Sequence, residues 1–230
     1  MKIYGLQKMT LLDYPGRVAC TVFTGGCNFR CPFCHNAALV TQLDADGAYY
    51  TEDDVLAFLN KRTGLLDGVC ITGGEPLINP DISDFIYKIK QLGFLVKLDT
   101  NGSFPDKLSA LIDSGLVDYV AMDIKNCRER YAETAGADID TEKINKSIEI
   151  LKSGKTEYEF RTTVVKEFHT VEDIACAAKW ICSADKYFLQ NFIDSGNLIE
   201  GGLHAVSKEK LLEMRSAAQK FVKNTELRGI

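Results

Sequence analysis

The sequence predicts an α/β fold, a partial (βα)6 barrel that is open, with a mostly parallel sheet and outer helices. Two observations predict it. Short apolar, β-rich segments alternate with helical patterns about six times along the chain, and most of these helical patterns have an apolar face. Six units are too few for a closed eight-stranded barrel, so an open one is expected. Functional residues of such a barrel lie at the carboxyl ends of its strands.

Six segments have the apolar, β-rich composition of strands. They are Val18 to Thr24, Gly68 to Thr72, Phe94 to Asp99, Leu116 to Asp123, Tyr158 to Val165 and Lys186 to Phe192. Helices are expected between and after them, over Thr51 to Lys61, from Asn79-Pro80 onward, and over Pro105 to Ser114, Thr141 to Ser153, Thr170 to Cys182 and Ser207 to Val222. Polar, Gly-rich loops are expected over Gln42 to Tyr50 and Asp194 to Ala205.

Local signals define several of these helices. Thr51 and Thr170 each precede an Asp by three residues, which is the pattern of a capping box. Asn79 and Pro80 are expected to act as cap and first-turn proline of the next helix. That helix should bury one stripe of residues, Ile82, Phe85, Ile86 and Ile89. The last helix should bury Leu211, Met214, Ala218 and Phe221.

Composition limits the possible functions. The 230 residues suit a single domain spanning 1–230, and 46% hydrophobic with 26% charged residues is ordinary globular composition. A net charge of −5 without a long basic run argues against a nucleic-acid partner. No apolar stretch approaches the length of a membrane span, and the start lacks a signal-peptide pattern. A cytoplasmic protein is therefore expected.

The strongest chemical signal directly follows the first predicted strand. The segment Thr24-Gly-Gly-Cys-Asn-Phe-Arg-Cys-Pro-Phe-Cys-His-Asn spaces Cys27, Cys31 and Cys34 as C-x3-C-x2-C. Thiolates suit zinc or iron–sulfur centres, and three of them would leave one iron of a 4Fe-4S cluster open to a substrate. Zinc with His35 as fourth ligand is the alternative, but Cys34 and His35 are neighbours that do not easily face one ion. Unligated cysteines are a third possibility.

The remaining cysteines are scattered among apolar neighbours, and disulfides are disfavoured in the cytosol. These five are expected to be small buried hydrophobic residues: Cys20, Cys70, Cys127, Cys176 and Cys182. Two histidines also need interpretation. His169 lies just before a predicted helix and is expected to be a surface cap residue, whereas His204 lies in a Gly-rich loop that could contact a partner.

The cysteine loop resembles the signature of the radical S-adenosylmethionine (SAM) superfamily, and the resemblance covers essentially the whole chain. It implies two cofactors, a 4Fe-4S cluster on Cys27, Cys31 and Cys34 and S-adenosyl-L-methionine at the open iron. In that family the GGEP element binds the methionyl amine, a role that falls here on Gly73, Gly74 and Glu75. An ordinary turn is the alternative. No side chain is expected to act as a catalytic acid or base, because the cofactors carry the hard chemistry.

Further strand ends resemble elements of the glycyl-radical activating enzymes. Leu-Asp-Thr-Asn-Gly and Met-Asp-Ile-Lys are similar to their DTNG and D-x-K elements, in which acids bind the ribose and a monovalent cation and the lysine meets the carboxylate of SAM. The corresponding residues here are Asp99, Thr100, Asp123 and Lys125. A strand-end Asp that merely caps a helix is the alternative.

The adenine and carboxylate sides of SAM have candidates as well. His35 and Asn36 resemble the adenine-side CHN of the activating enzymes, with Phe33 as an apolar wall. Arg161 lies among β-branched residues of the fifth predicted strand and is expected to point into a cavity, because a buried guanidinium needs a partner. SAM could supply that partner, and a structural ion pair is the alternative.

The two ends of the chain resemble the activating proteins of anaerobic ribonucleoside-triphosphate reductase, through Gln7-Lys-Met-Thr-Leu-Leu-Asp-Tyr-Pro-Gly16 and Thr225-Glu-Leu-Arg-Gly229. The implied partners are that glycyl-radical enzyme, as the anaerobic ribonucleotide reductase large subunit, and flavodoxin or ferredoxin as electron donor. A short open barrel would admit a glycine loop of the partner from the side. A radical SAM enzyme acting on another glycyl-radical enzyme, a peptide or a small molecule, and a non-enzymatic metal-binding module, are the alternatives.

Overall fold

The computed structural model describes residues 1–42 and 49–229. One eight-stranded sheet runs in the order β1 to β8, and every neighbouring pair is parallel except β1 and β2. The strands are β1 (Ile3–Thr10), β2 (Ala19–Thr24), β3 (Gly68–Gly73), β4 (Leu95–Thr100), β5 (Tyr119–Asp123), β6 (Glu157–Val164), β7 (Tyr187–Asn191) and β8 (Thr225–Arg228). The predicted open, mostly parallel α/β architecture is confirmed.

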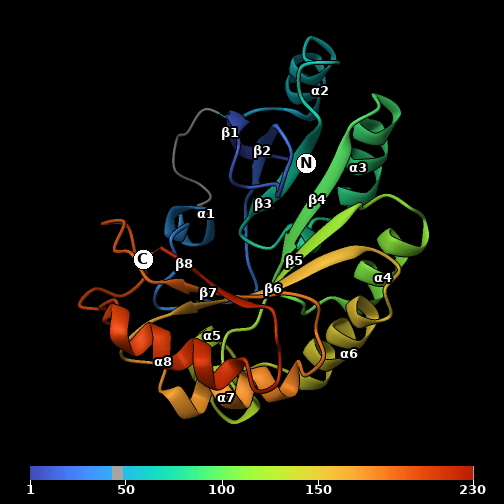
Figure 1. Cartoon of the computed structure of the whole chain (residues 1–230). Helices are drawn as coiled ribbons and strands as arrows, with labels where there is room; N and C mark the ends of the chain where they lie inside the picture. The colour runs from blue at the N-terminus through green and yellow to red at the C-terminus, as the bar shows by residue number, and fades with distance from the viewer. Residues whose placement is uncertain (43–48, 230) are drawn as a thin grey trace.

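Helices cover the outer face of this curled sheet, as Figure 1 shows for α3, α4, α6, α7 and α8. The helices are α1 (Ala37–Thr41), α2 (Glu52–Asn60), α3 (Ile82–Gln91), α4 (Pro105–Asp113), α5 (Tyr131–Ala135), α6 (Thr141–Lys152), α7 (Val171–Trp180) and α8 (Lys208–Ala218), with 3-10 turns η1 (Pro76–Ile78) and η2 (Arg128–Arg130). The predicted loop from residue 194 to 205 is irregular as expected. Most of the predicted loop Gln42 to Tyr50 lies outside the described residues.

The sequence predicted six strands, and the two that it missed, β1 and β8, are the edge strands of the sheet. The sequence pattern missed β1, whose residues alternate irregularly between buried and exposed, and β8, which is four residues long and contains two charges. β8 extends the parallel sheet beyond β7, and β1 pairs antiparallel with β2. Within the described residues no ladder joins β8 to β1, so the barrel is open between these strands.

Side chains cap the starts of four of the eight described α-helices, α2, α6, α7 and α8. Both predicted capping boxes, Thr51 with Asp54 and Thr170 with Asp173, are present. The predicted Asn79 cap is wrong, because the Asn79 side chain donates to the Pro76 carbonyl (3.1 Å) and closes η1. The N-cap position of α3 is instead Asp81.

Apolar stripes attach the helices to the sheet. The α3 stripe of Ile82, Phe85, Ile86 and Ile89 is buried as predicted, and each such side chain contributes about 1.5–3 kcal/mol. The α8 prediction holds for Leu211, Met214 and Ala218, whereas Phe221 lies beyond the helix end and is only half-buried. Cys20, Cys70 and Cys127 are buried as predicted. The same prediction is wrong for Cys176, on the outer side of α7, and for Cys182, in the turn after it, because both are exposed.

The register of the parallel strands sets the location of the polar residues. Thr24 lies beside Gly73 at the carboxyl ends of β2 and β3, and Asp123, the last residue of β5, lies beside Arg161 of β6. These ends therefore meet at one edge of the sheet, as parallel pairing requires.

No described helix is long and apolar enough to cross a membrane.

Candidate functional site

The cysteine loop follows β2 and is held by backbone hydrogen bonds to three other segments. The N–H of Gly26 donates to the Leu39 carbonyl (2.8 Å), and the Gly26 carbonyl accepts from the N–H of Glu75 (2.8 Å). Farther along, the N–H of Arg30 donates to the Ala135 carbonyl (2.9 Å). The loop that carries the three thiols is thus fixed to α1, to the end of β3 and to the end of α5.

One side of the loop is packed against the Gly-Gly pair at the end of β3. A Cβ on Gly74 would lie 1.9 Å from the Gly26 carbonyl oxygen, and one on Gly73 would lie 2.2 Å from that of Thr24. Gly73 also has a φ of +123°, which side chains rarely adopt. Asn36 completes the contact by donating to the Gly73 carbonyl (3.0 Å). We call these four residues, Gly26, Asn36, Gly73 and Gly74, the backbone wall.

A cavity lies over the carboxyl ends of the strands and is lined by residues from the cysteine loop and from β3 to β6. It collects thirteen of the residues singled out from the sequence. They are Cys27, Cys31, Phe33, Cys34, His35, Asn36, Gly73, Gly74, Asp99, Thr100, Asp123, Lys125 and Arg161. Residues more than 130 positions apart therefore share one site.

The opposite side of the cavity is ionic. Arg161 bridges two carboxylates, with Nη1 at 3.1 Å from Asp99 and Nε at 3.0 Å from Asp123. Lys125 pairs with the second oxygen of Asp123 at 3.0 Å. The structural ion pair considered for Arg161 is thus present, and Arg161 also lines the cavity. We call Asp99, Asp123, Lys125 and Arg161 the charged wall.

The charges of this wall offset their burial. Burial would raise the pKa of Asp123, but Lys125 and then Arg161 outweigh it and hold that pKa at about 2. Burial also opposes ionisation of Asp99, whose pKa is nevertheless lowered by Arg161 and Lys97. Lys97 lies beneath the wall, fully buried, with its ammonium paired to Asp99. Both carboxylates are therefore ionised and held in place before any ligand arrives.

The three thiols of the cysteine loop are not gathered as closely as the ligands of a single zinc ion. A tetrahedral zinc holds its sulfur ligands about 3.8 Å apart. Within the described residues, the Cys27, Cys31 and Cys34 thiols do not all lie within 4.8 Å of one another. Thiolates that each bind a different iron of a cluster lie farther apart than the ligands of one zinc ion, and three thiolates match three of the four irons of a 4Fe-4S cluster. The three thiols therefore fit a 4Fe-4S cluster. The His35 ring packs against the Phe192 ring, with the two ring centroids 5.7 Å apart.

Comparison with known proteins agrees with this donor set. The family model described as the radical SAM superfamily matches residues 21–181. This chain belongs to the radical SAM superfamily. Members of this superfamily use a 4Fe-4S cluster and S-adenosylmethionine.

Individual relatives indicate to which group within the radical SAM superfamily the chain belongs. The protein of Methanocaldococcus jannaschii named "Putative glycyl-radical enzyme activating enzyme" is 31% identical over 99% of this chain and 96% of its own length. The "Pyruvate formate-lyase-activating enzyme" of Clostridium pasteurianum is 31% identical over 54% of this chain and 52% of its own length. This radical SAM protein therefore belongs with the glycyl-radical enzyme activating enzymes, and it is an enzyme.

A solved structure supports the fold alone. The crystal structure of Streptococcus suis SuiB aligns with a TM-score of 0.70 at 15% identity, covering 91% of this chain and 48% of SuiB. The radical SAM chain thus spans about half the length of that protein. At this identity the likeness shows the shared open barrel and no more.

Among the residues that the sequence assigned to the cluster or to SAM, Glu75 is the only one that does not line the cavity. Its carboxylate accepts from the N–H of Asn101 (2.6 Å), the hydroxyl of Thr100 (2.9 Å) and the N–H of Leu77 (3.1 Å). Burial raises its pKa to about 7, against the lowering effect of these donors. Glu75 thus joins the end of β3 to the end of β4 beneath the cavity.

His169 is buried, so the prediction that it is a surface cap residue is wrong. Its Nδ1 accepts from the N–H of Val165 (3.0 Å), so the proton is on Nε2, which donates to the Lys125 carbonyl (2.8 Å). His169 therefore orients the backbone of a charged-wall residue. The sequence offers no local sign of this contact, which spans 44 positions. His204 is exposed and pairs with Glu167 at 2.8 Å.

Asn101 also lines the cavity and is absent from the predicted site residues. Its side-chain amide lies 3.9 Å from the Cys27 sulfur and donates to Asn28 (2.9 Å). The signal was available, because Asn101 is the third residue of the DTNG element.

Proposed function

We propose that this protein cleaves S-adenosylmethionine reductively at a 4Fe-4S cluster and generates a glycyl radical on a partner enzyme. When bound, the cluster supplies the electron that breaks a carbon–sulfur bond of SAM. Cys27, Cys31 and Cys34 would hold it, and its fourth iron would be open to SAM. The observation that carries the proposal is the convergence of these thiols with the backbone wall and charged wall on one cavity.

The backbone wall would bind the methionyl amine. The Gly73 carbonyl already accepts one hydrogen bond from Asn36, and a carbonyl oxygen has a second lone pair for an ammonium group. Glu75 would support this side from beneath, since its hydrogen bonds fix the strand ends on which Gly73 and Thr100 lie. Gly74 keeps the cysteine loop close to the end of β3. One SAM molecule could therefore reach the backbone wall with its amine and the open iron of the cluster at the same time.

The charged wall would bind the carboxylate and the ribose. Lys125 and Arg161 are the cations for the SAM carboxylate, and Asp99, Thr100 and Asp123 are the groups for the ribose and a monovalent cation. Because Asp123 is ionised with a pKa of about 2, it can accept hydrogen bonds or bind a cation across the physiological pH range. On the adenine side, His35 and Asn36 offer polar contacts, and Phe33, which packs on Phe168 at 5.8 Å, offers an apolar wall.

We further propose that the chain is a single domain over 1–230 and that its partner is the large subunit of an anaerobic ribonucleoside-triphosphate reductase, with flavodoxin or ferredoxin as electron donor. The near full-length similarity to the Methanocaldococcus jannaschii protein supports a glycyl-radical enzyme as substrate. The terminal segments Gln7 to Gly16 and Thr225 to Gly229 favour the reductase. The exposed position of His35 on the cavity lining gives a protein loop a way in.

Electron paramagnetic resonance on the reductase tests the proposal. The reductase is incubated anaerobically with this protein, a reductant and SAM, and a glycine-centred doublet is expected. Cys34→Ser should abolish the doublet, and the exposed Cys182→Ser should leave it unchanged. SAM cleavage without a doublet, and without any dependence on the reductase, would instead indicate a peptide, a small molecule or another glycyl-radical enzyme as substrate.

A further inference from the structure

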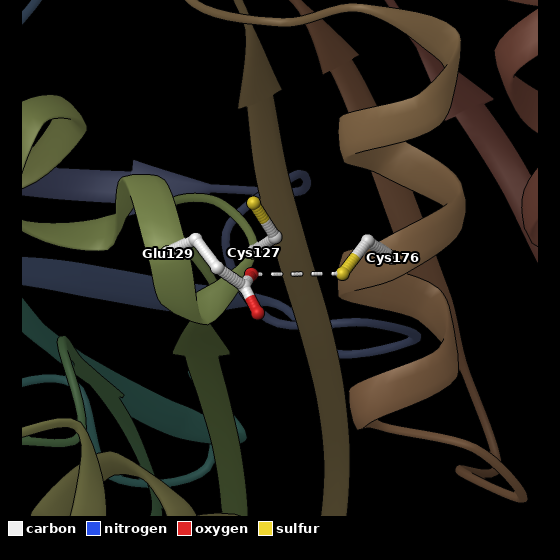
Figure 2. A group of neighbouring side chains, drawn as sticks. All are labelled: Cys127, Glu129 and Cys176. Atoms are coloured by element: carbon white, nitrogen blue, oxygen red, sulfur yellow. Dashed lines mark hydrogen bonds between the residues drawn. The ribbon is translucent and has the colours of Figure 1, made fainter.

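A second group of metal-binding side chains lies away from the cavity. Among the described residues, the Cys127 sulfur, a Glu129 carboxylate oxygen and the Cys176 sulfur all lie within 4.8 Å of one another (Figure 2). Cys127 is at the N-cap position of η2, Glu129 lies within η2, and Cys176 lies on α7. None of the three lines the cavity.

Both thiols are held by well-fixed backbone. The N–H of Cys127 donates to the Asn126 side chain (2.8 Å), and the Cys127 carbonyl accepts from the N–H of Arg130 (3.2 Å). Cys176 lies in the middle of α7, whose first turn is closed by a capping box. Glu129, by contrast, is exposed, so its side chain can adjust to a ligand.

The hydrogen bonds show which carboxylate is available to a metal. Asp173 accepts from the Cys127 thiol (3.8 Å) with one oxygen, but its other oxygen is bound by Arg130 at 2.7 Å. One Glu129 carboxylate oxygen accepts a hydrogen bond from the Cys176 thiol (3.9 Å), as the dashed line in Figure 2 shows. Two sulfurs and one carboxylate thus converge from η2 and α7.

We propose that Cys127, Cys176 and Glu129 bind Zn²⁺, with water as the fourth ligand. Two thiolates select a soft or borderline cation over Mg²⁺ or Ca²⁺, which take oxygen ligands. A tetrahedral zinc with a sulfur at about 2.3 Å and a carboxylate oxygen at about 2.0 Å spaces these two ligands by about 3.5 Å, and the Cys176–Glu129 contact of 3.9 Å is close to this spacing. Only the Cys127 sulfur and the flexible Glu129 side chain need small movements.

The zinc ion would stabilise the segment from η2 to α5, which holds the cysteine loop in place. The segment from η2 into α5 ends at Ala135, whose carbonyl holds the N–H of Arg30 in that loop at 2.9 Å. Zinc would tie the start of this segment to α7. It would therefore raise the melting temperature of the holoenzyme without entering the radical chemistry.

The test uses the holoenzyme, in which iron and sulfide occupy the three loop cysteines. After excess iron and sulfide are removed, the protein is equilibrated with zinc chloride and desalted, and zinc, iron and sulfide are measured per chain. We expect one zinc per chain with the cluster retained. X-ray absorption at the zinc edge should show two sulfurs at about 2.3 Å and two oxygens at about 2.0 Å.

Variants connect the zinc to the three residues. Cys176→Ser should remove the bound zinc and the zinc-dependent rise in melting temperature, Glu129→Gln should weaken binding, and Cys182→Ser should match the wild type. Cys176 is exposed, so its replacement leaves the core intact. The proposal is overturned by three results: no zinc retained by the wild type, equal zinc retained by Cys176→Ser, or zinc gained only as iron is lost.

Discussion

The two walls of the cavity bring their groups together in different ways. The backbone wall depends on close approach, since Gly74 leaves no room for a Cβ beside the Gly26 carbonyl. The charged wall depends on compensation, since Arg161 and Lys125 neutralise carboxylates from two strands. The first wall should therefore fail when volume is added, and the second should fail when a charge is removed.

Removal of a charge should have the largest effect on stability. Asp99→Asn leaves Lys97, whose side chain is 2% exposed, without its counter-charge, and we expect the free energy of unfolding of the cluster-free protein to fall by about 3 kcal/mol. Urea denaturation measures this. Asp113→Asn, which breaks the exposed pair with Lys155, should change stability little. Equal losses in the two variants would show that the wall does not depend on charge compensation.

Addition of volume should break the backbone wall. Gly74→Ala must push the cysteine loop away from β3, at a cost of about 2 kcal/mol, and should lower the iron bound per chain after reconstitution. Iron analysis and thermal unfolding check the two effects. Gly201→Ala is the matched control, because nothing lies within 4 Å of its Cβ position. Normal iron content in Gly74→Ala would contradict the account.

Glu75, beneath both walls, should give stability a pH dependence. Burial raises its folded-state pKa from 4.5 to about 7, so the folded protein keeps a proton that the unfolded chain releases near pH 4.5. Stability from this group is therefore present at low pH and is lost as the pH rises from about 4.5 to about 7.

Comparison with Glu75→Gln isolates this dependence. The wild type should lose stability relative to the variant as the pH rises through that window, measured as the difference between their melting temperatures. His169, whose pKa burial lowers, contributes the opposite slope but does so equally in both proteins. A difference that stays constant from pH 4.5 to 7 would mean that Glu75 is ionised throughout.

The smallest effect is expected where the two sides meet, at Asn101. Its amide lies 3.9 Å from the Cys27 sulfur, and hydrogen bonds to cluster sulfurs raise the reduction potential. Asn101→Ala should therefore shift the cluster potential slightly negative in a redox titration monitored by paramagnetic resonance. Asn28→Ala removes the neighbouring 2.9 Å contact but spares the sulfur and should leave the potential unchanged. A positive shift in Asn101→Ala would refute this role.

The walls also differ in how far the sequence could predict them. The backbone wall consists of short segments that local sequence patterns identify. The cysteine loop and the Gly-Gly pair could therefore be predicted from the sequence. Every residue of the charged wall was singled out, but its pairing was not, because the Arg161–Asp99 contact joins strands 62 positions apart. The inward burial of Lys97 and His169 depends on the same long-range packing and was missed.

The fold shows the same division between local and distant information. Six strands and both capping boxes follow from local patterns and were predicted. The edge strand β8 was not, because its four residues include two charges and its Arg228 is held by Glu159, 69 positions earlier. The prediction of Asn79 as a helix cap was wrong, because its side chain hydrogen-bonds to the Pro76 carbonyl and closes η1 instead.

Reductive cleavage of SAM by the reconstituted enzyme tests the central claim most directly. The wild type, reduced with dithionite, should form equal amounts of methionine and 5′-deoxyadenosine. Serine at position 27, 31 or 34 should abolish both products, while Cys182→Ser should form them at the wild-type rate. Undiminished cleavage in any of the first three variants would contradict a cluster held by these cysteines.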